Sequence, residues 1–286
     1  MFRTEPVAAS EEDWQLRLEV GGGDAGADQS DGVATLVLDR PEKLNAWSWE
    51  ASRQLARLAA RVRFDDRIRV LVVRGSGRAF CAGVDLGLPE DRITGRSAAE
   101  RARNFAEGLR WVHEQFRAFA TLPQPIIAAV HGYCLGFGFE LALMCDIRVA
   151  SHDAVFALPE AQIGMAVDAG GEMRLAREAG SGWAKLLALT GRRIDAATAA
   201  RIGVVQEVTP PEDLLPTAYA LAREIAGNAP LAVQAIKRSV DAFADRGLAE
   251  AMDRAALLAA TTFISEDAPI GYAAKAARRT AEFEGK

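Results

Sequence analysis

The sequence predicts an α/β protein whose sheets lie inside and are covered by helices. Short strand segments and amphipathic helices alternate along the first two thirds of the chain, and the remainder is helical from Gly180 onward. Residues 69–75 and 126–130 are short apolar runs, which are typical of strands buried on both faces. A glycine-rich turn at residues 132–138 then leads directly into an apolar helix.

The composition sets limits on the class of protein. A chain of 286 residues with 50% hydrophobic and 26% charged residues suits one large globular domain or a core with an appendage. The formal net charge of −5 disfavours a nucleic-acid partner. No apolar run reaches membrane-spanning length, so we expect no membrane partner. The chain has three cysteines, and their spacing is not that of metal ligands. This pattern predicts reduced thiols in a cytoplasmic protein and no metal site.

The first elements follow in chain order. Residues 1–13 read as an acidic tail, and residues 14–20 alternate apolar and polar as a half-buried strand does. Residues 21–32 are rich in glycine and aspartate and predict a flexible loop. Residues 33–39 are a second strand. We therefore expect a hairpin with an unusually long connection.

The following segments continue the strand and helix pattern. An amphipathic helix is predicted after Pro41, with Leu55, Leu58 and Val62 on one side. Residues 156–164 predict a further strand that ends in a turn. The helices after Gly180 end where C-cap glycines are expected, at Gly191, Gly203 and Gly227.

The stretch 125–151 carries the first candidate for chemistry. Its strand, glycine turn and apolar helix bring free backbone N–H groups and the positive end of a helix dipole to one point. Such a point can hold a phosphate or a developing oxyanion. A second turn, within residues 74–86, also follows a buried strand and contains the small residues Ala82, Gly83 and Val84. Two such turns can aim two main-chain donors at one carbonyl oxygen.

Three acids lie in apolar or glycine-flanked contexts. Glu140 is in the first turn of the central helix, Glu160 follows Pro159, and Asp168 lies eight residues further on. Carboxylates gathered in an apolar pocket lose hydration and repel one another, and both effects raise their pKa values. The three histidines, His113, His131 and His152, are scattered and are interpreted as structural. Neither a dinucleotide fingerprint nor a nucleophile elbow is present.

Four segments together resemble the crotonase superfamily, the enoyl-CoA hydratases and isomerases. They are RPEKLNAW, GRAFCAGVDL, IIAAVHGYCLGFGFELALMCDIRVAS and FALPEAQIG, in family order and at family spacing. The resemblance implies a spiral of ββα repeats over residues 14–205 and a helical trimerisation region over residues 206–286. It also implies an acyl-CoA thioester substrate, no cofactor beyond the CoA of that substrate, and a homotrimer or a dimer of trimers.

Carried over by position, the resemblance assigns the oxyanion hole to the N–H groups of Ala82 and Phe137. The family usually has a small residue, often glycine, where Phe137 stands, so its side chain is expected to reshape the acyl pocket. Residues 88–116 are expected to form the wall of that pocket. The resemblance places the CoA moiety near the following residues: Lys43, Ala82, Gly83, Val84, Asp85 and Gly136.

The acids leave two reactions open. Glu140 and Glu160 fall on the two glutamates with which hydratases add water across an enoyl thioester. Asp168 instead resembles the aspartate with which dienoyl-CoA isomerases, together with the glutamate at Glu160, move protons along a conjugated 3,5-diene. Those isomerases generally carry aspartate where Glu140 stands, so the predicted site is mixed. A non-catalytic acyl-CoA-binding member of the fold is a further alternative.

Overall fold

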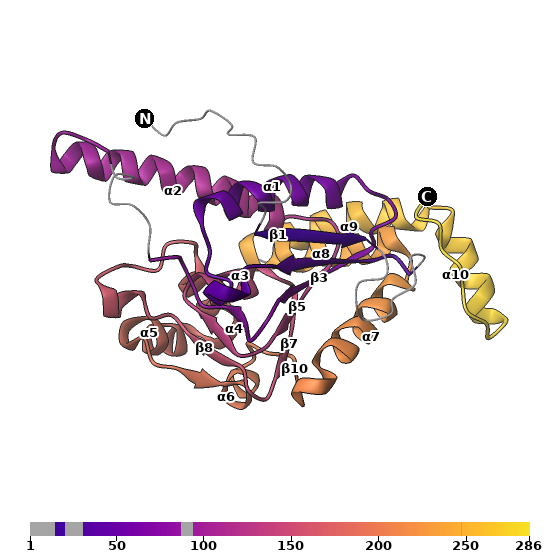
Figure 1. Cartoon of the computed structure of the whole chain (residues 1–286). Coiled ribbons are helices and arrows are strands. Elements are labelled where there is room, and N and C mark those ends of the chain that lie inside the picture. The colour runs from indigo at the N-terminus through magenta and orange to yellow at the C-terminus, as the bar shows by residue number, and fades with distance from the viewer. Residues whose placement is uncertain (1–14, 21–30, 87–93, 247) are drawn as a thin grey trace.

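A computed structural model describes residues 15–20, 31–86, 94–246 and 248–286 of the chain. It confirms the predicted α/β architecture (Figure 1). The predicted acidic tail and most of the predicted loop at 21–32 lie outside the described residues. Within the described ranges no helix is long and apolar enough to cross a membrane.

The larger sheet has six strands in the order β1-β2-β3-β5-β7-β10. β1 and β2 are antiparallel, as expected for a hairpin, and each later pair of neighbours is parallel. The strands span Leu16–Val20, Val33–Leu38, Val70–Gly75, Ile126–Val130, Ile147–Ser151 and Glu207–Thr209.

The sequence of β3 explains why this sheet is buried on both faces. Val70 and Val72 point into one apolar core, which helix α7 (Leu214–Ala226) completes. Leu71 and Val73 point into the other and larger core. A continuous apolar run is therefore required at a strand whose successive side chains face two cores.

The smaller sheet has four strands in the order β4-β6-β8-β9. They span Ala79–Cys81, Tyr133–Leu135, Val155–Ala157 and Ile194–Asp195. Three strands of the larger sheet, β3, β5 and β7, are each followed along the chain by one strand of the smaller sheet. This repeat is the predicted strand-strand-helix unit. The prediction missed β4 and β6, because three-residue strands beside glycines read as turns.

Ten α-helices occur among the described residues. They span Trp49–Arg63, Ala98–Ala120, Phe137–Met144, Gly171–Ala179, Ser181–Thr190, Ala196–Arg201, Leu214–Ala226, Pro230–Arg246, Leu248–Phe263 and Asp267–Ala276, as α1 to α10. Short 3-10 turns lie at Pro41–Lys43 and Glu160–Ile163. Figure 1 shows α7 in orange beside the larger sheet.

Helix α3 is the centre of the molecule, since all eight of its residues are buried. Helix α8 is attached to the same region by Lys237, whose Nζ lies 2.6 Å from Asp146 Oδ2 and 3.0 Å from the carbonyl oxygen of Gln124. The C-terminal helices α8 and α9 pack on each other beyond this attachment.

Candidate functional site

The candidate site lies where three chain segments leave the smaller sheet. β4, β6 and β8 are parallel neighbours, so their carboxyl ends reach the same edge. The turn at 82–86 follows β4, the turn at Gly136 follows β6 and leads into α3, and Glu160 follows β8. The predicted site residues of all three segments therefore meet at one place, as ligand sites at the carboxyl ends of parallel strands do.

Close backbone contact joins the first two turns. A Cβ atom on Gly138 would lie 2.3 Å from the carbonyl oxygen of Cys81, and one on Gly136 would lie 3.7 Å from the Cα of Gly83. Gly83 and Gly136 also have φ angles of 104° and 52°, which L-residues with side chains rarely adopt. Glycine is needed here so that the two turns can touch.

The prediction that Ala82 supplies an oxyanion donor is wrong. Its N–H already donates to the carbonyl oxygen of Leu44 at 3.0 Å. That carbonyl reaches Ala82 because Leu44 and Asn45 have left-handed φ angles of 53° and 57°. The Asn45 side chain holds this turn by donating to the carbonyl oxygens of Ser76 and Ala79.

Val84 presents the free N–H of that turn. The Trp47 N–H donates to Gly83 O at 2.8 Å, and the Asp85 N–H donates to Trp47 O at 2.9 Å. Val84 lies between Gly83 and Asp85 in this parallel bridge, so its own N–H points away from Trp47. No acceptor for it occurs in the described part of the chain. The sequence predicts that Val84 lies at the site, but it contains no signal that Val84, rather than Ala82, has the free N–H group.

Phe137 presents the second free N–H. It is the first residue of α3, and a helix offers no acceptor to its first N–H groups. Gly136 N–H donates instead to Ala157 O at 2.9 Å, and Glu140 N–H donates back to Gly136 O at 3.0 Å. Within the described ranges nothing accepts from Phe137 N–H. Two unused donors thus lie on two turns that touch.

The Phe137 side chain is buried in a cluster of three aromatic rings. Its centroid lies 4.6 Å from that of Trp47 and 4.8 Å from that of Phe116. Phe116 belongs to α2, so the described part of the predicted wall at 88–116 contacts Phe137, the residue that follows the turn at Gly136. Residues 88–93 lie outside the described part of the chain.

Glu140 is fixed at the N-terminus of α4. Its side chain is buried, and Oε1 accepts from the N–H groups of Ala169 at 2.9 Å and Gly171 at 2.8 Å. Burial raises the pKa of Glu140 to about 8, and the nearby carboxyls of Asp168 and Glu160 act in the same direction. The two N–H bonds partly oppose this rise. Because Oε1 accepts both bonds, the acidic proton belongs on Oε2.

Glu160 lies against the turn at Gly136. A Cβ atom on Gly136 would be 2.8 Å from Glu160 Oε1. Oε2 is buried and has no hydrogen-bond partner among the described residues. Burial raises the pKa of Glu160, and Asp168 and Glu172 raise it further. A buried carboxyl oxygen without a partner is costly, which is typical of an atom reserved for a ligand or a proton.

Asp168 is the third acid of the same group. Its pKa is raised by burial and by Glu172 and lowered by His113, whose Nε2 lies 2.5 Å from the Asp168 carbonyl oxygen. Asp168 raises the pKa values of both Glu140 and Glu160, and Glu160 raises that of Glu140, so the structure brings the three acids together. The sequence context of His113 predicts a structural histidine and contains no signal of a contact with the acids.

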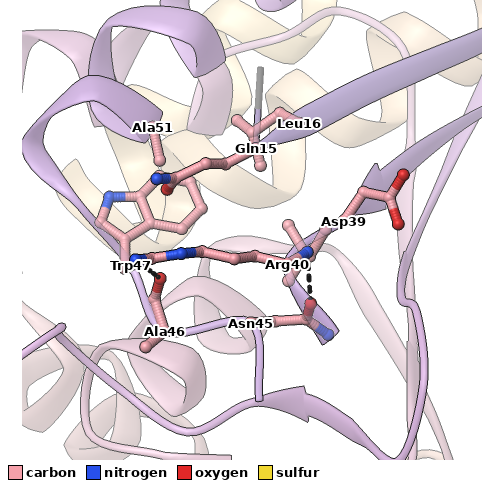
Figure 2. A pocket seen from close by; sticks show the side chains of 9 residues that line it. Gln15, Leu16, Asp39, Arg40, Asn45, Ala46, Trp47 and Ala51 are labelled. Carbon is pink, nitrogen blue, oxygen red and sulfur yellow. Dashed lines mark hydrogen bonds between the residues drawn. The ribbon is translucent and has the colours of Figure 1, made fainter. Parts of the chain in front are cut away.

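The positions predicted for the CoA moiety follow the same turns. Asp85 is bound to Arg40 Nη1 at 2.7 Å, and Lys43 is exposed in the 3-10 turn next to Arg40. Figure 2 shows a small pocket that is lined in part by Arg40, Ala46 and Trp47. Arg40 extends there beside the Trp47 ring and donates to Ala46 O. None of the three acids lines that pocket, so it is separate from the acid cluster.

Comparison with known proteins identifies the group to which this chain belongs. The family model described as enoyl-CoA hydratase/isomerase matches residues 28–286. The chain belongs to the enoyl-CoA hydratase/isomerase family. The resemblance to the crotonase superfamily and its fold is therefore confirmed.

Individual relatives of this enoyl-CoA hydratase/isomerase family member carry different reaction names. The chain is 37% identical to carnitinyl-CoA dehydratase of Proteus mirabilis, over 89% of this chain and 95% of that protein. It is 35% identical to the mitochondrial Delta(3,5)-Delta(2,4)-dienoyl-CoA isomerase of Dictyostelium discoideum, over 82% of each chain. The crystal structure of enoyl-CoA hydratase from Bacillus anthracis superposes with a TM-score of 0.81 at 30% identity, covering 89% of this chain and 96% of that one.

We predict that Gly136→Ala destabilises the protein by about 1–3 kcal/mol, because alanine is strained at this φ and its Cβ would contact Glu160. Urea denaturation measures the change. Gly182→Ala is the matched control, since a Cβ there meets nothing within 4 Å and lies in helix α5. The control is expected to be neutral or slightly stabilising. Equal stability of the two variants would contradict the prediction.

The raised pKa of Glu140 leads us to predict a specific pH dependence of stability. Its pKa rises from 4.5 to about 8 on folding, so the folded state binds the proton more tightly. The free energy of unfolding should then fall as pH rises from about 4.5 to about 8, by a few kcal/mol at about 1.4 kcal/mol per pKa unit. Glu140→Gln keeps the acceptor and removes the titration. A wild-type-minus-variant difference that stays constant from pH 5 to pH 8 would refute this expectation.

Proposed function

We propose that this protein is an acyl-CoA enzyme that acts on the C=C bond of an enoyl-CoA thioester through an enolate. The observation that carries the proposal is the pair of unused N–H groups, on Val84 and Phe137, beside the buried acids. The thioester carbonyl oxygen accepts from both donors. Negative charge that develops on this oxygen is then stabilised by fixed dipoles in a site from which water is largely excluded.

In the main reaction, Glu140 and Glu160 hold a water molecule above the acyl plane. The water oxygen bonds to C3 while the π electrons of the C2=C3 bond move onto the carbonyl oxygen. Glu160 lies closest to the oxyanion turn and therefore reaches C2, which is bonded to the carbonyl carbon. It delivers a proton to C2, and the proton lost by water restores the carboxyl pair. The product is the 3-hydroxyacyl thioester.

A second reaction is supported by Asp168 and by the similarity to a dienoyl-CoA isomerase. In a 3,5-dienoyl thioester, one carboxylate of the Glu160 and Asp168 pair removes a proton from C2 and forms a dienolate. The other carboxyl then protonates C6, which leaves the 2,4-diene. No water is consumed, and the same oxyanion donors stabilise the intermediate. The CoA moiety extends from these donors toward Asp85 and Lys43.

The proposal is tested with purified protein and 2-enoyl-, 3-enoyl- and 3,5-dienoyl-CoA thioesters. The absorbance of the thioester-conjugated chromophore falls on hydration and rises when a double bond moves into conjugation. We expect turnover of at least one substrate. Tight binding without turnover of any of them would instead favour a non-catalytic acyl-CoA-binding protein.

Single substitutions separate the acids. Glu160→Gln should lower kcat by about 10²–10⁴-fold on every substrate that turns over, because proton delivery at C2 is lost. Asp168→Asn should abolish diene isomerisation and spare hydration. Glu207→Gln is the matched control, since that glutamate is exposed on β10. An active Glu160→Gln variant would eliminate the proposed chemistry.

We further propose that the protein is a homotrimer or a dimer of trimers. Ile236, Val240 and Phe243 form an exposed apolar stripe on α8, at a spacing that places them on one helix face. A second copy of the chain is the occupant that closed symmetry favours. A cytoplasmic location is proposed as well, supported by three buried cysteines without a disulfide.

Light scattering tests the assembly. The wild-type mass should be three or six times that of the chain. Val240→Glu should dissociate the assembly, because a charge in a buried apolar contact costs several kcal/mol. Phe64→Glu, at a phenylalanine that is 82% exposed after α1, is the control and should not change the mass. A monomeric wild type would rule the trimer out.

A further inference from the structure

His113 of helix α2 contacts the segment that carries the third acid. Its Nε2 lies 2.5 Å from the carbonyl oxygen of Asp168. A carbonyl oxygen can only accept, so Nε2 carries the hydrogen and donates it. The contact joins two elements that are 55 positions apart in sequence.

The register of α2 places this contact, which is exposed to solvent, beside the site region. Phe116 lies three residues after His113 and therefore on the same side of the helix. Phe116 packs against Phe137, whose N–H is one of the two unused donors. One side of α2 thus contacts the oxyanion turn through Phe116 and the Asp168 segment through His113. Movement of α2 would displace both.

The charge of His113 also acts on the Asp168 carboxyl. Burial raises the pKa of Asp168, and within the described ranges it is His113 that counters this rise through its charge. Glu172 of α4 acts against ionisation. Glu140 and Glu160 also face Asp168, since each has its own pKa raised by it.

One further cation lies beside this segment. Arg174 Nη1 donates to the carbonyl oxygen of Ala169 at 3.0 Å, so its charge is directed to the peptide next to Asp168. The acids that interact with Asp168 come from α3, α4 and the 3-10 turn at Glu160–Ile163, and His113 comes from α2.

We propose that His113 is a positioning residue for Asp168. Its Nε2–H holds the Asp168 peptide against α2, and its ring favours the ionised form of the Asp168 carboxyl beside Glu160. The inference depends on the proposed function in one respect, namely that Asp168 acts on a substrate. It assigns the histidine a role in proton transfer along a diene without placing it in contact with the substrate.

Two substitutions separate the bond from the charge. His113→Gln retains a side-chain N–H donor and removes the charge, whereas His113→Phe removes both. His152→Gln is the matched control, since that histidine is exposed in the turn after β7. Infrared titration of protein labelled with ¹³C-aspartate follows the carboxylate band, and the band lost in Asp168→Asn identifies Asp168.

The expected result is an upward shift of the Asp168 pKa in both His113 variants and none in the control. On the substrate that Asp168→Asn impairs, kcat should fall about 10–100-fold in His113→Phe with little change in KM, and less in His113→Gln. An unchanged Asp168 pKa in both variants would overturn the inference. The titration needs no substrate, so it decides the inference even if the proposed reactions are not observed.

Discussion

The site depends on direct backbone contact between the turn after β4 and the turn after β6. No side chain lies between Gly138 and the Cys81 carbonyl, or between Gly136 and Gly83. The separation of the Val84 and Phe137 N–H groups is therefore set by main-chain van der Waals distances rather than by flexible side chains. Donors fixed in this way need little reorganisation when charge develops on a bound oxygen.

The acids are arranged around that fixed pair at an electrostatic cost. Loss of hydration raises the pKa of each of the three carboxyls, neighbouring carboxyls raise it further, and the fold offsets part of this cost locally. Glu140 receives two N–H bonds at the start of α4, and Asp168 lies beside His113. Glu160 receives no comparable compensation at Oε2. The environments therefore differ, which is what allows similar groups to hold protons with different strengths.

Local patterns in the sequence were enough to predict the buried strands, the glycine turn into α3 and the set of three acids. They could not distinguish Ala82 from Val84, because the deciding bond comes from Leu44, in a turn whose left-handed conformation has no glycine to indicate it. The contact of His113 with Asp168 depends on how α2 packs, and no short-range pattern encodes such packing. Strand β6 was missed since its pairing partners lie far along the chain.

The repeat of paired strands has a consequence for how such a protein can change. Each of three successive repeats ends in a turn that contributes a separate part, with Val84 after β4, Phe137 and Glu140 after β6, and Glu160 after β8. Asp168 lies on a further loop that is held by α2 rather than by a strand. An acid can therefore be gained or lost in one segment while the donor pair in the others stays intact. A change of reaction that keeps the two main-chain donors in place would need only such local substitutions.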